Sequence, residues 1–207
     1  MKDTGYYYEM RGLAQEVRAR NEIEGPDVSM REMWRTFRAE GIEELHFRHG
    51  FKQLRGAYFN DEYGVTVMLA GGLPDEPTIF TMAHELKHHL VDSESGTVLC
   101  RTDEQMRRVE IGAEVFAAEF IYPEKDFVYD LFRLLRGMPQ SVTPELLTEL
   151  KRKTQTTLSY AALAKRAVLL RLADEQVFKG VRWRALERRE NKIQAASSRV
   201  ENSRGVS

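Results

Sequence analysis

The sequence lacks the features that define several common protein classes. Its 207 residues include one cysteine, Cys100, which excludes an intrachain disulfide and is typical of a reducing compartment. No apolar run approaches the length of a membrane span, and the start, Met1-Lys2-Asp3-Thr4-Gly5, lacks the apolar core of a signal peptide. The formal net charge is −1, so no overall field favours nucleic acid or an anionic membrane. These absences predict a cytoplasmic protein with no membrane partner.

The apolar content is sufficient for one hydrophobic core, because 42% of the residues are hydrophobic. Apolar residues at helical spacing predict helices over residues 6–21 and Met30–Ala39. Residues 45–69 are rich in β-forming side chains, with a hairpin loop predicted over residues 60–64. Strands followed by helices are typical of an α+β fold. We therefore expect a small antiparallel sheet of about three strands packed on helices.

The last third of the chain predicts a separate helical region. Thr143 and Pro144 have the residue types of an N-cap and a first helical position, and a further helix is predicted over residues 157–173. From Val181 onward basic residues outnumber acidic ones by a small margin, which favours a solvated tail over a nucleic-acid contact. We expect three parts: a domain over residues 1–140, a helical extension over 141–190 and a disordered tail over 191–207.

The strongest chemical signal is the run Thr81-Met82-Ala83-His84-Glu85-Leu86-Lys87-His88-His89, which contains His-Glu-x-x-His. Two histidines four residues apart lie on one face of a helix, so both imidazoles can reach one metal ion. Glu85 then lies beside the pair, where it can act as a base on a water molecule. Zinc suits two imidazole nitrogens plus a carboxylate and leaves a position open for catalysis. The motif therefore predicts a zinc hydrolase, most simply a protease.

The neighbouring residues favour this interpretation over a surface helix that carries two histidines by chance. Thr78 has the residue type of an N-cap, which gives the predicted helix a defined start. His84 and His88 border a predicted buried face, whose apolar residues are Ile79, Phe80, Met82, Ala83, Leu86 and Leu90.

A second motif extends from Glu110 to Pro123. Its apolar residues recur at three- and four-residue steps, which predicts a core-facing helix that ends at Pro123. Glu110 and Glu114 are one turn apart beside this stripe, and one of them can complete a site of two histidines and one glutamate. Spacing alone does not separate the two, and both can also be ordinary solvated carboxylates.

The two motifs together resemble those of ImmA/IrrE-type metallopeptidases. The matching segments are Phe80–His88 and Glu110–Pro123, with weaker support from residues 54–58 and the hairpin, and the resemblance spans residues 5–140. It implies a zincin-like core with His84, His88 and Glu110 as zinc ligands and Glu85 as general base. Glu114 stands where the family often has Asn or Asp, so the resemblance favours Glu110 as the ligand and leaves Glu114 as the alternative.

Two positions depart from the family pattern. Lys87 occupies a place often held by Gly, and Asp92 stands where another His is frequent. Neither is an expected ligand, so the chemistry is unaffected, although loop geometry and specificity can differ. The group that stabilises the reaction's oxyanion is not specified by the sequence, and Tyr122, Tyr58 and His89 are the candidates.

The resemblance also implies a biological role. Characterised members cut a partner helix-turn-helix repressor and so release stress-response or mobile-element genes, and we expect a substrate of this kind. An edge of the residue 45–69 sheet can pair with an extended substrate segment. One Zn²⁺ per chain is expected, and the ligand types also suit Mn²⁺ or Fe²⁺. The alternative is a binding module without catalysis that sequesters a repressor or antitoxin. Direct nucleic-acid binding is not expected, and the sequence does not specify the oligomeric state.

Overall fold

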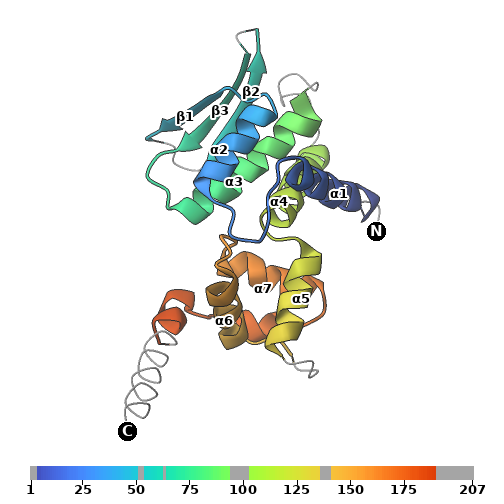
Figure 1. Ribbon diagram of the computed structural model, residues 1–207, viewed down its shortest axis with the longest axis vertical. Coiled ribbons are helices and arrows are strands. Elements are labelled where there is room, and N and C mark those ends of the chain that lie inside the picture. The colour runs from blue at the N-terminus through green and yellow to red at the C-terminus, as the bar shows by residue number, and fades with distance from the viewer. Residues whose placement is uncertain (1–3, 51–53, 63, 94–102, 136–140, 190–207) are drawn as a thin grey trace. The chain divides into compact units, whose positions relative to one another are not determined.

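The computed structural model describes residues 4–50, 54–62, 64–93, 103–135 and 141–189 (Figure 1). The chain divides into two compact units. Unit 1 comprises Met1–Phe127 with Thr156–Leu158, and unit 2 comprises Val128–Gln155 with Ser159–Ser207. The tail over residues 191–207, for which disorder was expected, lies outside the described residues. The expected division at residues 140 and 190 stays a prediction.

Unit 1 begins with two helices, α1 (Thr4–Arg20) and α2 (Met30–Ala39), which confirm the two helices expected there. A capping box starts α2, because the Ser29 side chain accepts from the Glu32 amide and the Glu32 carboxylate accepts from the Ser29 amide. The helix ends before Gly41, whose φ of 90° is a conformation that favours glycine.

A mixed three-stranded sheet follows, with strands β1 (Glu44–Arg48), β2 (Gly56–Asp61) and β3 (Gly64–Ala70) in the order β1-β3-β2. The α+β class is confirmed. The hairpin is also confirmed, since β2 and β3 pair antiparallel from Gly56 opposite Leu69. The expectation of a wholly antiparallel sheet is wrong for one pair, because β1 runs parallel to β3. β2 occupies one side of β3, so β1 pairs with the other side.

The two motif helices are α3 (Asp75–Lys87) and α4 (Asp103–Ile121), and a π-helical turn, η1 (His88–Asp92), continues α3 directly. The prediction of Thr78 as the N-cap of α3 is wrong. The helix starts one turn earlier, with Asp75 and Glu76 in its first turn, where acidic side chains interact favourably with the helix dipole. The Thr78 hydroxyl instead donates to the Pro74 carbonyl inside the helix.

The core of unit 1 lies on both sides of α3, which packs on β2 and β3, on α2 and on α4, while α4 packs on α1 (Figure 1). Most of the expected stripe of α3 is buried, and its residues Ile79, Met82 and Leu86 face this core with Val67 and Leu69 of β3. Phe80 and Leu90, also expected in that stripe, are half-buried. From α4 the buried stripe consists of Ala113, Phe116, Ala117 and Phe120. Two helices whose apolar stripes meet in one core hold their flanking polar residues at fixed positions.

Unit 2 is helical over its described residues. α5 (Glu124–Leu134) begins in unit 1 and continues into unit 2, followed by α6 (Pro144–Thr154), α7 (Tyr160–Leu169) and a short 3₁₀ turn, η4 (Glu175–Phe178). Thr143 caps α6 with Pro144 in its first turn, as expected. α7 is shorter than the predicted helix over residues 157–173. Within the described ranges, no helix combines the length and apolar composition that a bilayer span requires.

Candidate metal centre

His84 and His88 present their imidazole rings side by side on one face of the α3–η1 helix. Their Nε2 atoms are 3.1 Å apart and their ring centroids 4.9 Å apart. The side chains are 18% and 12% exposed, so both nitrogens lie at the border of the core where solvent still has access. This is the arrangement that the four-residue spacing predicts.

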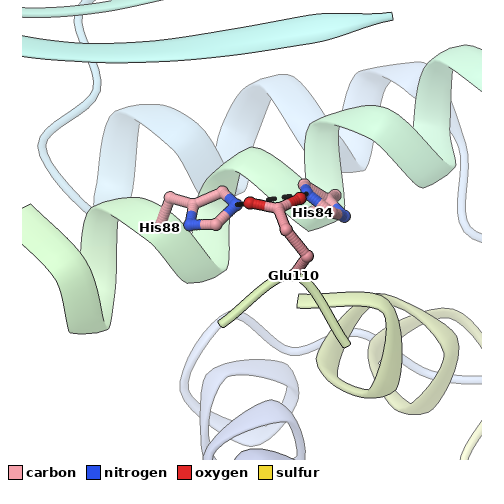
Figure 2. Close-up of side chains that lie close together, drawn as sticks. All are labelled: His84, His88 and Glu110. Atoms are coloured by element: carbon pink, nitrogen blue, oxygen red, sulfur yellow. Dashed lines mark hydrogen bonds and ion pairs between the residues drawn. The ribbon is translucent and has the colours of Figure 1, made fainter. Parts of the chain in front are cut away.

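Glu110 extends from α4 towards the two rings (Figure 2). Its Oε2 is 3.3 Å from Nε2 of His84 and its Oε1 is 3.6 Å from Nε2 of His88. Among the described residues this is the one group of three or more potential metal-binding side chains with ligand atoms within 4.8 Å of one another. Glu114 is exposed one turn further along α4 and is not part of this group.

The donor set fits a tetrahedral divalent metal. Bonds of about 2.0–2.1 Å to a tetrahedral zinc hold the ligand atoms roughly 3.3 Å apart. The three separations in the structure, 3.1, 3.3 and 3.6 Å, fall on both sides of that value. Two imidazoles and a carboxylate leave a further position for water or substrate, and they do not separate zinc from manganese or iron.

Glu110 and Glu85 lie in opposite electrostatic environments. A hydrogen bond with His84 lowers the pKa of Glu110 despite its partial burial, and its side chain is 49% exposed. Burial instead raises the pKa of Glu85, whose residue is 5% exposed, and Glu110 acts in the same direction, whereas the two histidines act to lower it. A carboxyl group with a raised pKa holds a proton better, which suits a group that takes and returns protons.

Gly56 at the start of β2 makes room for the Glu85 carboxylate. A Cβ atom at Gly56 would lie 2.6 Å from Oε1 of Glu85 and 2.5 Å from Cγ2 of Thr81. The backbone of β2 therefore passes directly over the carboxylate, and any side chain there would displace it. The sequence placed Gly56 within the family-like run but gave no sign of this long-range contact.

Asp92 holds the ring of His88 from the side opposite the cluster. Its Oδ2 is 2.8 Å from Nδ1 of His88 and 2.7 Å from Nζ of Lys87. Burial acts to raise the pKa of Asp92, but hydrogen bonds from His88 and Lys87 keep it below its ordinary value. In neutral His88 the proton is thus on Nδ1, and a bare Nε2 lone pair faces the carboxylate of Glu110. A bound cation would satisfy these two facing acceptors.

The candidates for the oxyanion-stabilising group separate into two environments. The Tyr58 hydroxyl is 3.0 Å from Nδ1 of His89, and Nε2 of His89 is 2.7 Å from the Glu40 carbonyl. Since a carbonyl only accepts, His89 donates from Nε2 and accepts the Tyr58 proton at Nδ1. Tyr122 has no exposed surface and packs edge-on against Phe127 in the core, so it does not reach a substrate in this structure.

A comparison with protein-family models places the chain in a known family. The model described as IrrE N-terminal-like domain, Peptidase_M78, matches residues 40–167, a range that begins at the end of α2 and includes both motif helices. None of the curated proteins compared with the chain matches it.

Proposed function

The chain belongs to this IrrE N-terminal-like family of metallopeptidases, and we propose that it is a zinc-dependent endopeptidase that cleaves a helix-turn-helix repressor. The proposal rests on one observation above all: His84, His88 and Glu110 converge from two helices, with the buried carboxylate of Glu85 beside them. The cytoplasmic location and the regulatory circuit are part of the proposal, supported by the single cysteine and by the family.

In the proposed mechanism the three ligands are His84, His88 and Glu110. Zinc held there would supply a Lewis acid that activates water and polarises the scissile carbonyl. Glu85 accepts a proton from the attacking water and returns it to the leaving amine, a role that its burial and raised pKa support. Tyr58 and His89 remain the candidates to stabilise the oxyanion, because both are partly exposed. Either residue would have to redirect its donor, which now bonds His89 in the case of Tyr58 and the Glu40 carbonyl in the case of His89.

The free edge of β2 is the proposed binding site for an extended substrate segment. Among the residues that the structure describes, β2 is the outermost strand of the sheet and pairs with β3 on one side. Gly56 at its start lies against Glu85, so a peptide aligned along this edge passes the catalytic base. Main-chain hydrogen bonds between a peptide and an edge strand give affinity that does not depend on the peptide's sequence. Contacts with neighbouring side chains then supply specificity for the substrate.

The test is incubation of the full-length protein with the helix-turn-helix repressor encoded nearest to its gene, followed by mass spectrometry of the products. We expect two fragments with zinc-loaded wild type, and intact repressor with chelator or with Glu85→Gln. A Glu85→Gln variant that inactivates the repressor as well as wild type does, without fragments, would instead support the non-catalytic binding module.

A further inference from the structure

Two buried charged side chains adjoin the metal ligands and have no role in the proposed chemistry. Lys87 has no exposed side-chain surface, and Asp92 is 10% exposed. Their Nζ and Oδ2 atoms are 2.7 Å apart. A buried ammonium group costs several kcal/mol of desolvation, so its retention beside the ligands calls for an explanation beyond ordinary packing.

The π-helical turn makes this ion pair possible. In an α-helix, residues five apart point about 140° away from each other around the axis, which would separate Lys87 from Asp92. The π-helical segment His88–Asp92 forms hydrogen bonds between residues five apart and so brings such residues to the same side. The turn begins at the second histidine, so the change in winding occurs where the ligand is presented.

The ion pair contacts both helices of the cluster. Oδ2 of Asp92 also accepts from Nδ1 of His88 at 2.8 Å, on α3–η1. Nζ of Lys87 donates to the Val109 carbonyl on α4 at 3.2 Å, one residue before Glu110. The Tyr6 ring covers the ammonium, with its centroid 5.8 Å from Nζ. One connected set of contacts therefore joins a histidine to the helix that carries the glutamate.

We infer that Lys87 and Asp92 are positioning residues for the metal. Asp92 orients the ring of His88 so that Nε2 points towards the cluster. Lys87 holds Asp92 through the ion pair and holds α4 in position through its hydrogen bond to the Val109 carbonyl. A hydrogen-bond acceptor at the distal nitrogen of a ligating histidine orients the ring and raises metal affinity, and its loss costs about 10–100-fold. The inference deepens the proposed function and rests on it, because it requires a metal at His84, His88 and Glu110.

A purely structural role for the ion pair makes a different prediction. Replacing both members of a buried ion pair by apolar side chains of similar volume often leaves stability unchanged or improved. If the pair serves packing alone, such a replacement also leaves metal affinity unchanged. If it positions His88, the fold survives but affinity falls, and a neutral hydrogen-bond acceptor at position 92 restores it.

The experiment is a zinc titration against a chromophoric competitor with full-length protein. The positioning role predicts that Lys87→Met with Asp92→Leu weakens zinc binding about 10–100-fold, and that Lys87→Met with Asp92→Asn stays within about threefold of wild type. The matched control neutralises a half-buried ion pair of unit 1 that lies outside the cluster, Arg11 and Glu124, by Arg11→Met with Glu124→Gln, and keeps wild-type affinity. Wild-type affinity in the leucine variant, or an equal loss in both double variants, would overturn the inference.

A second measurement needs no variant and so does not depend on variants that fold. Nitrogen-15 NMR of metal-free wild type, at a pH where the ring is neutral, reports which nitrogen of His88 carries the proton. The inference predicts a protonated Nδ1 and a bare Nε2, and the opposite tautomer would overturn it. Failure of wild type to bind zinc in the titration would count against the proposed function, whereas the tautomer tests the contact with Asp92 alone.

Discussion

Helix α4 has a polar cluster in its N-terminal half and another near its C-terminal end, and the two clusters use buried charge differently. Near the C-terminal end, the buried guanidinium of Arg18 donates to the Phe120 and Ile121 carbonyls, and the buried Glu119 accepts from the Gln15 amide. These side chains pair with one another and with the carbonyls that a helix end leaves without partners inside the helix. Charge at this end holds α1 and α4 together.

In the N-terminal half of α4, Glu110 turns its carboxylate towards two histidine side chains and not towards backbone groups. Glu110 faces His84 and His88, and burial raises the pKa of the neighbouring Glu85. Burying a carboxylate costs stability, so this arrangement is expected where function requires it. The difference between the two clusters indicates that the partners of a buried charge, more than its burial, distinguish a functional site from a structural contact.

The largest expected effect is the loss of catalysis in Glu85→Gln. The amide keeps the shape of the side chain but cannot take a proton, so the cleavage rate falls by about 10²–10⁴-fold. Zinc affinity stays within a few-fold of wild type, because Glu85 is not one of the expected ligands. Cleavage kinetics and metal content measured on one preparation check both parts. A variant that retains cleavage would remove Glu85 from the mechanism.

The next effect separates the two glutamates of α4. Glu110→Gln removes an expected ligand and weakens zinc binding by more than about 100-fold. The reason is that losing a direct ligand costs more affinity than losing a hydrogen bond to a ligand, which costs up to about 100-fold. Glu114→Gln on the same helix is the matched control and keeps wild-type affinity, as its side chain lies outside the cluster. The reverse ranking in a competition titration would transfer the ligand role to Glu114.

Tyr58→Phe tests the oxyanion-stabilising role. If Tyr58 donates to the developing charge, kcat falls by about 10²-fold while KM and zinc affinity change little. The hydroxyl also bonds His89, so His89→Gln is measured beside it to show whether the effect depends on that contact. An unchanged kcat in Tyr58→Phe would show that a group other than Tyr58 stabilises the oxyanion.

Arg18→Met tests the structural role of the polar cluster near the C-terminal end of α4. Loss of the guanidinium leaves buried carbonyls without donors, so the free energy of unfolding falls by about 2–4 kcal/mol. The folded fraction nevertheless binds zinc with wild-type affinity, because Arg18 does not contact the cluster. Denaturant unfolding and zinc titration give the two values. A loss of zinc affinity at temperatures where the variant is fully folded would contradict this, because it would show that Arg18 also influences the metal cluster.

The smallest expected effect concerns Glu40 and its pH dependence. Burial acts to raise the pKa of Glu40, but hydrogen bonds from Arg20 and Asn21 lower it below its ordinary value of 4.5. A depressed pKa in the folded state stabilises the protein above pH 4.5, and this contribution is lost as the pH falls through the folded-state pKa. Glu40→Gln therefore costs at most about 1 kcal/mol at neutral pH, and the difference in Tm shrinks at acid pH. A difference in Tm between wild type and Glu40→Gln that grows on acidification would contradict the predicted direction of the pKa shift.

Features with a local sequence signal were predictable. The four-residue spacing of His84 and His88 needs only a helical period, and the apolar stripe after Glu110 placed that helix in the core. The contacts of Gly56 with Glu85, and the parallel pairing of β1 with β3, depend on segments distant in the sequence and have no local pattern. The π-helical turn changes residue spacing itself, so Asp92 was noticed only as a departure from the family and not as a partner of His88.

The most direct test of the central claim is an anomalous difference map, calculated from a crystal of the zinc-loaded protein with data collected on both sides of the zinc absorption edge. We expect one strong peak per chain, in contact with Nε2 of His84, Nε2 of His88 and the carboxylate of Glu110. Zinc bound elsewhere, or no peak at these three side chains in protein that has bound zinc in solution, would contradict it.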